Sequence, residues 1–123
     1  MADSSGTGPG VVEFAALPWL EEGPRIHSRA AAMAGDRCAV VRYGPGAARD
    51  EWCTDGHRGY VIEGRMTYEL ATGERLEVPP QAGFWLPPGL GHRGVNGSEE
   101  TLVFLVDVPD DAGERGEPGE PGR

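Results

Sequence analysis

Residues 83–96 read GFWLPPGLGHRGVN, a short aromatic run followed by a Pro/Gly turn and a histidine. Proline fixes φ and glycine allows positive φ, so the stretch from Pro87 to Gly89 predicts a tight turn. His92 follows directly, where the chain enters its next segment. The glycines at 89–94 also match GxGxxG, but another turn and a β-type run follow in place of a helix. Nucleotide binding is therefore not indicated.

Short β-type runs separated by turn residues extend on both sides of this stretch. We predict strands at 11–15, 25–32, 37–43, 59–62, 66–70, 75–78, 84–86 and 101–108. Many short strands at a spacing of about 8–12 residues indicate an all-β sandwich or a small barrel. The helical alternatives are confined to 17–23 and 28–35. The last run is apolar on both faces, so we expect its outward face to meet a partner strand or a second subunit.

The two ends of the chain differ in composition from its centre. Residues 1–10 are polar and glycine-rich, and residues 109–123 read PDDAGERGEPGEPGR. Neither end has enough apolar side chains to bury, so a disordered head at 1–10 and an acidic disordered tail at 109–123 are predicted. The remaining residues, 11–108, have the length of a single domain.

The charge of the chain excludes several function classes. Asp and Glu number 20 against 11 basic residues, the net charge is −9, and every basic residue is arginine. An acidic surface does not suit phosphate backbones or anionic lipid, so neither nucleic acid nor a membrane is an expected partner. Mechanisms that need a lysine are excluded. No apolar leader or spanning run is present and there are only two cysteines, so we expect a cytoplasmic protein with free thiols.

A second stretch, DEWCTDGHRGYVIEG at residues 50–64, concentrates metal-ligating residue types. Glu51 and Cys53 are two residues apart, so on a strand their side chains face the same side. His57 follows an Asp-Gly turn pair and can face back toward them. A carboxylate, a thiolate and an imidazole suit a d-block metal. A barrel that closes in this order brings His92 to the same cavity.

The two stretches resemble the two motifs of the cupin superfamily, small jelly-roll barrels with one metal site inside. The second motif, P-x-G-x-x-H-x-x-x-N, is matched in full by residues 87–96, and YVIEG at 60–64 matches the end of the first. The family's glycine six residues before the proline is Gln81 here, and we expect Gly83 to compensate with a shifted turn. The resemblance implies a double-stranded β-helix, or jelly-roll barrel, and a homodimer.

The ligand positions of the first motif depart from the family pattern. Glu51 and Cys53 stand where the family has two histidines, and His57 stands where it has a glutamate; His92 is unchanged. Because each replacement is itself a metal-binding type, a re-typed site is favoured over a lost one, and both remain open. The set Glu51, Cys53, His57 and His92 suits zinc best and ferrous iron next. Three ligands with an open position would be catalytic, and four closed ligands structural.

The resemblance implies a small cupin that acts as a metal-dependent enzyme on a small molecule, of dioxygenase, isomerase, lyase or cyclase type. Glu51 or His57, if not a ligand, is expected to move protons. Arg42, Arg58 and Arg93 are candidates to hold an anionic substrate. Two alternatives stay open: a non-catalytic module that binds a metal or a small ligand, and a metal-free barrel kept for stability or assembly.

Overall fold

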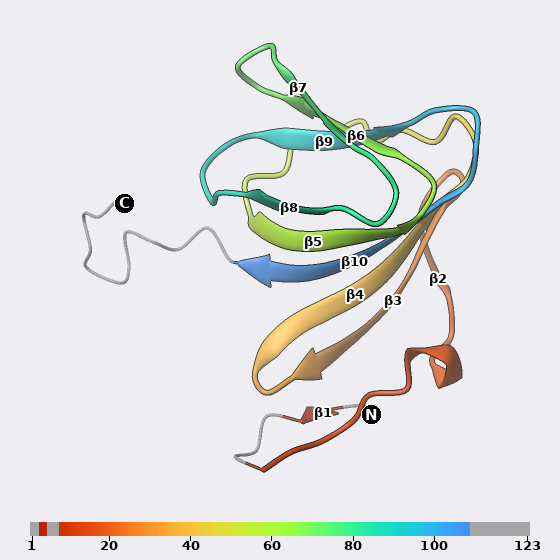
Figure 1. The fold of residues 1–123 in the computed structure, drawn as a ribbon, viewed down its shortest axis with the longest axis vertical. Helices are drawn as coiled ribbons and strands as arrows, with labels where there is room; N and C mark the ends of the chain where they lie inside the picture. The colour runs from red at the N-terminus through yellow and green to blue at the C-terminus, as the bar shows by residue number, and fades with distance from the viewer. Residues whose placement is uncertain (1–2, 5–7, 109–123) are drawn as a thin grey trace.

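The computed structural model describes residues 3–4 and 8–108, which form an all-β unit (Figure 1). The strands are β1 Asp3–Ser4, β2 Leu20–Gly23, β3 Ile26–Met33, β4 Asp36–Tyr43, β5 Gly56–Glu63, β6 Met66–Leu70, β7 Arg75–Val78, β8 Gly83–Leu86, β9 His92–Asn96 and β10 Thr101–Val108. A short 3-10 helix, η1, spans Phe14–Ala16. Within the described part, no helix has the length and apolar character needed to cross a membrane. The predicted tail at 109–123 and most of the predicted head lie outside the described residues, although β1 falls within 1–10.

The strands form two sheets that face each other across the core. The larger sheet has seven strands in the order β1-β3-β4-β10-β5-β8, with β2 paired to β3; the smaller has three in the order β7-β6-β9. Figure 1 shows the smaller sheet lying across one end of the larger one. Pairing is antiparallel except between β1 and β3. The predicted jelly-roll barrel is confirmed.

Strand alternation places the core between the sheets. On β10, Thr101, Val103 and Leu105 are buried while the residues between them are half-buried, as the period of two requires. The larger sheet supplies Ile26, Ala39, Val41, Val61, Phe84 and Leu86 to the core, and the smaller sheet supplies Met66, Tyr68 and Val78. The core therefore fills the barrel between the sheets except where the pocket described below lies.

The outer face of the larger sheet is covered in part by the chain's own N-terminal segment. Phe14 packs edge-on against Phe104 of β10, with ring centroids 6.0 Å apart. Trp19 is contacted by the guanidinium groups of Arg29 and Arg42, at 4.0 and 4.3 Å from its ring centroid. The apolar outward face predicted at 101–108 therefore meets a segment of the same chain at Phe104.

One predicted strand was wrong, and neither of the two helical alternatives is found. Residues 28–35 form no helix, because the alanines of β3 pair along β4 and Ala34 and Gly35 make the turn with positive φ values of 52° and 92°. The helical alternative at 17–23 is strand β2, paired with β3. The strand predicted at 11–15 is instead an irregular segment that leads into η1 and lies on the outer face of the sheet.

The glycine that ends the first motif is required by packing. Gly64 has a φ of +84°, and a Cβ built there would lie 2.5 Å from both Glu100 O and Thr101 Oγ1. No side chain fits that space. The turn at Gly64 thus brings the connection between β5 and β6 against the start of β10.

The asparagine that ends the second motif is a hydrogen-bonding centre. Its Nδ2 lies 3.1, 2.8 and 2.7 Å from the carbonyl oxygens of Tyr43, Gly44 and Glu99, and its Oδ1 accepts a hydrogen bond of 2.9 Å from Thr101 Oγ1. Asn96 is itself 6% exposed. These bonds fasten the end of β9 to the end of β4 and the start of β10.

The turn before β8 does not shift as expected. Gln81 itself adopts the left-handed conformation, with a φ of +61°, and its N–H donates to Val61 O at 2.8 Å. Gly83 begins β8 in the ordinary strand pairing with Tyr60. Gln81 therefore takes the backbone conformation that glycine adopts most easily, and no compensation by Gly83 is needed.

Candidate metal centre

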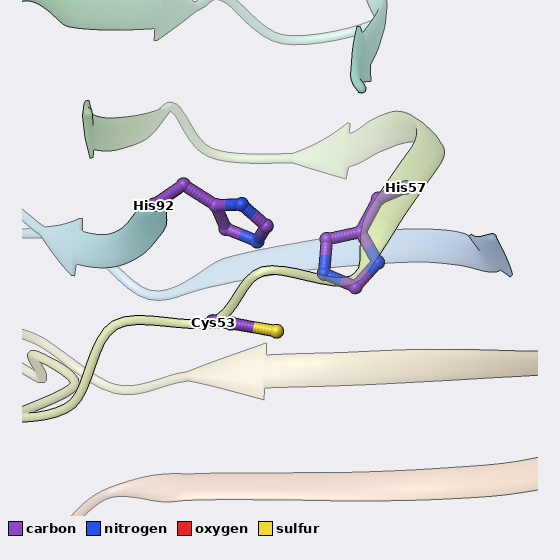
Figure 2. Close-up of side chains that lie close together, drawn as sticks. All are labelled: Cys53, His57 and His92. Atoms are coloured by element: carbon purple, nitrogen blue, oxygen red, sulfur yellow. The ribbon is translucent and has the colours of Figure 1, made fainter. Parts of the chain in front are cut away.

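Three of the four predicted ligands converge in one pocket between the sheets. One ligand atom from each of Cys53, His57 and His92 lies within 4.8 Å of the other two. Figure 2 shows the Cys53 sulfur and both imidazole rings directed toward a shared space. Since the residues come from three separate segments, the arrangement is a product of the fold.

His92 is held at the start of β9 with one nitrogen free. Its Nδ1 lies 3.2 Å from Leu90 O, and its Nε2 is buried without a hydrogen-bond partner. Burial lowers the pKa of His92 below its ordinary value of 6.5, and the neighbouring His57 lowers it further. A neutral imidazole that bonds through Nδ1 and leaves Nε2 unpaired is ready to ligate a metal.

Cys53 reaches the cluster through a single β-bridge. Its N–H donates to His92 O at 2.8 Å, and the His92 N–H donates to Cys53 O at 2.9 Å. Residues 51–53 do not form the strand that the sequence analysis assumed. The bridge nonetheless fixes the backbones of two candidate ligands to each other.

His57 lies on β5 and completes the cluster from the opposite sheet. Its ring centroid is 4.9 Å from that of His92, with the rings at 72°. Its Nδ1 lies 3.2 Å from Oδ1 of Asp107, directly across the ladder on β10, although the two groups are not aligned for a full hydrogen bond. Burial raises the pKa of Asp107, but His57 and Arg37 outweigh it and bring the pKa below its ordinary value.

Glu51 lines the same pocket without joining the cluster. Glu51 is exposed in the connection to β5, and no oxygen of Glu51 is among the mutually close ligand atoms. Its role as a metal ligand stays a prediction.

The pocket around the cluster has a volume of about 220 Å³. Tyr68 is one of its walls: the ring is 2% exposed, its centroid lies 6.0 Å from that of His92, and its hydroxyl is buried with no partner in the described residues. Burial raises the pKa of Tyr68 well above 10. Tyr43 also lines the pocket, and its hydroxyl accepts a hydrogen bond of 3.3 Å from Arg49 Nε. An unpaired buried hydroxyl in such a wall is suited to bind a polar atom of a ligand.

The three arginines that line the pocket are already paired with carboxylates. Arg49 bonds Glu22 at 2.8 Å, Arg37 bonds Asp107 at 2.8 Å, and Arg93, which lies over the Trp52 ring, bonds Glu69 at 3.0 Å. Of the arginines predicted to hold an anionic substrate, Arg93 is the one that lines the pocket. Arg42 stacks on Trp19 outside the barrel, and Arg58 is exposed on the outward face of β5.

Sequence reasoning missed Tyr68 and Asp107. Asp107 gave no clear signal, because the run at 101–108 is apolar on both faces and alternation alone does not tell which face is inward. Tyr68 gave no clear signal either, since a tyrosine within a strand is most often an ordinary core residue.

The donor set fits a transition-metal ion. One thiol and two imidazoles are ligands for zinc and ferrous iron, and the unpartnered Nε2 of His92 is an acceptor that the described residues leave unused. Three protein ligands leave a coordination position toward the pocket. The residues present are therefore chemically suited to a divalent metal.

Comparison with known proteins supports the fold. No protein-family model and no curated protein sequence matches the chain. Among solved structures, KdgF from Halomonas sp. is 25% identical over 75% of this chain and 87% of its own, with a TM-score of 0.62. The polyketide cyclase RemF from Streptomyces resistomycificus is 23% identical over 85% of this chain and 81% of its own, with a TM-score of 0.67.

A third similar structure carries the family name. It is a sugar phosphate isomerase of the cupin superfamily from Silicibacter pomeroyi, 18% identical over 80% of this chain and 75% of its own, with a TM-score of 0.64. The paired sheets, the two motif segments and the inward His57 and His92 agree with that likeness. The chain thus has a cupin-type fold, and its Glu51, Cys53 and His57 stand at the variant positions of the segment that resembles the first cupin motif.

Proposed function

We propose that Cys53, His57 and His92 hold a divalent metal ion and that the chain is an enzyme acting on a small molecule in the adjoining pocket. The observation that carries the proposal is the convergence of three metal-ligating atoms on one enclosed space beside a free cavity. Three ligands and an open side are the usual arrangement of a catalytic metal centre, whereas a structural site is closed by four.

Zinc is the proposed ion, with ferrous iron as the second choice. A thiolate favours softer ions, and two imidazoles suit either metal. If Glu51 moved in as a fourth ligand, the site would be closed and structural in type, so its place outside the cluster favours the catalytic arrangement.

The metal ion and the pocket residues would have separate roles in polarising the substrate, orienting it and transferring protons. The bound ion would act as a Lewis acid toward a substrate oxygen. Tyr68 would donate its free hydroxyl proton to a second substrate oxygen and so fix the orientation. Glu51, with its carboxylate at the pocket and open to solvent, would move protons in and out.

The reaction class is proposed as isomerase, cyclase, lyase or dioxygenase. The similar structures include a polyketide cyclase and a sugar phosphate isomerase, which supports the first two. A cavity of about 220 Å³ suits a small substrate. Because the arginines of the pocket already bond carboxylates, a polar substrate with little net charge is favoured over a strongly anionic one.

Elemental analysis of the purified protein tests the metal site. We expect about one equivalent of metal in the wild type, and little in Cys53→Ser, His57→Ala or His92→Ala. His27→Ala is the matched control, because His27 lies on β3 away from the pocket. Circular dichroism confirms that each variant is folded. Full metal retention in all three cluster variants would refute the proposed site, and a metal-bound protein without any turnover would favour a binding module.

The chain is also proposed to form a homodimer in the cytoplasm. Trp85 is 75% exposed and Tyr60 44% exposed, and both have outward parity on the neighbouring strands β8 and β5. A partner surface would cover these rings. Cys38 and Cys53 are unpaired, which suits a reducing compartment. Sedimentation equilibrium should give the mass of two chains for the wild type and of one for Trp85→Arg; a monomeric wild type would contradict this.

A further inference from the structure

A carboxylate on β10 stands behind the candidate ligand His57. Asp107 lies opposite His57 in the β5–β10 ladder, with Oδ1 3.2 Å from His57 Nδ1. Its other oxygen, Oδ2, accepts a hydrogen bond of 2.8 Å from Arg37 Nη1 on β4. The side chains of His57 and Asp107 are 14% and 19% exposed, so water competes little for either. The row Arg37–Asp107–His57 crosses three adjacent strands and ends at the metal cluster.

The partner of one imidazole nitrogen decides what the other can do. A neutral imidazole carries its proton on one nitrogen and a lone pair on the other, and only the lone pair can bind a metal. An ionised carboxylate accepts hydrogen bonds and cannot donate them, so Asp107 favours the proton on Nδ1. The lone pair is then on Nε2. Leu90 O also only accepts hydrogen bonds, so it favours the proton on Nδ1 of His92 and the lone pair on Nε2.

We propose that Asp107 is a positioning residue that fixes the tautomer and ring orientation of His57, so that Nε2 is presented to the metal. Arg37 holds the carboxylate in place through its second oxygen. The 3.2 Å separation lacks the alignment of a full hydrogen bond, so the proposal requires a rotation of the ring or of the carboxylate when a ligand binds. The proposal rests on the proposed function, in that the cluster holds a divalent ion.

The tautomer of His57 can be measured without any metal. Long-range ¹H–¹⁵N correlation spectra of the metal-free protein, at a pH of about 8 where imidazoles are mostly neutral, report which nitrogen carries the proton. We expect the proton on Nδ1 in the wild type and a substantial population on Nε2 in Asp107→Leu. A wild type that is protonated on Nε2 overturns the proposal.

Metal affinity provides the second readout. Zinc is titrated in competition with a chromophoric chelator, and we expect Asp107→Leu to bind about 10–100-fold more weakly than the wild type. Asp107→Asn should lose less, because its amide oxygen still accepts from Nδ1. Asp36→Asn is the matched control, since Asp36 is an exposed carboxylate at the start of β4 that does not line the pocket, and it should bind like the wild type.

The two readouts separate the two proposals. If the wild type binds no zinc, the proposed function fails, while the tautomer spectrum still tests the role of Asp107. If the wild type binds zinc and both Asp107→Leu and Asp107→Asn bind it equally well, the role of Asp107 is refuted and the metal site stands. Asp107→Asn keeps the shape of the side chain, so it serves where Asp107→Leu does not fold.

Discussion

Replacing Asn96 by alanine should remove a large part of the stability of the barrel. The two amide protons of Asn96 are shared among the carbonyl oxygens of Tyr43, Gly44 and Glu99, and its Oδ1 accepts from Thr101. That makes three hydrogen bonds at a buried site, each worth about 1 kcal/mol net. The loss is therefore about 3 kcal/mol, against a total of about 5–15 kcal/mol for a typical domain.

Urea unfolding of the metal-free protein, followed by tryptophan fluorescence, measures this loss. For a slope of about 2 kcal/mol per molar urea, Asn96→Ala should lower the midpoint by about 1.5 M. Ser98→Ala is the matched control, because Ser98 is exposed in the same connection and should leave the midpoint unchanged. A loss below about 1 kcal/mol for Asn96→Ala would refute the reasoning, because it would mean that water replaces the bonds of Asn96.

Three further outcomes are expected. Burial holds the pKa of His92 below 6.5 in the folded protein, so the unfolded chain binds the proton more tightly. The metal-free protein should therefore have its full stability above pH 6.5 and lose stability as the pH falls toward the folded-state pKa. Urea titrations at several pH values should show that His92→Gln flattens this dependence. Tyr68→Phe removes a buried hydroxyl without a partner, so the metal-free protein should melt a few degrees higher. The same variant should lower kcat/KM of the identified reaction. A lower melting temperature would show that water satisfies the hydroxyl. Gly64→Ala should lower the free energy of unfolding by at least about 2 kcal/mol more than Gly73→Ala. Both glycines have positive φ, but only at position 64 would the added Cβ clash with backbone atoms. Equal losses of stability in urea unfolding would contradict this steric argument.

The sequence predicted the barrel well because its turns are chemically explicit. The strands at 66–70, 75–78 and 101–108 match β6, β7 and β10 at both ends, since Gly and Pro bound each run. β9 was missed, because HRGVN contains only one large apolar residue and shows no alternation. It forms a strand because it pairs with β6, from Leu70 opposite His92 to Met66 opposite Asn96. Long-range pairing of this kind leaves little trace in the local pattern.

The candidate site was predictable where a motif fixed the spacing and less so elsewhere. Cys53, His57 and His92 were expected to meet in one cavity, and their ligand atoms do lie together. Glu51 was placed beside Cys53 on the assumption of a strand. The backbone there forms only an isolated bridge, so side chains two residues apart need not face the same side. Asp107 comes from the last strand of the barrel, and its distance in sequence from His57 gave no reason to connect them.

The two ends of β9 are fastened to the larger sheet by different means. At one end Asn96 is bonded to the ends of β4 and β10, and these bonds need no other component. At the other end the side chains of His92 and His57 of β5 meet only through an edge-on ring contact, with centroids 4.9 Å apart, and the proposed metal ion would join them. Metal removal should therefore accelerate amide hydrogen exchange at Cys53 and His92 while the amide of Asn96 keeps its protection. An occupied site would thus tie both ends of β9 to the larger sheet.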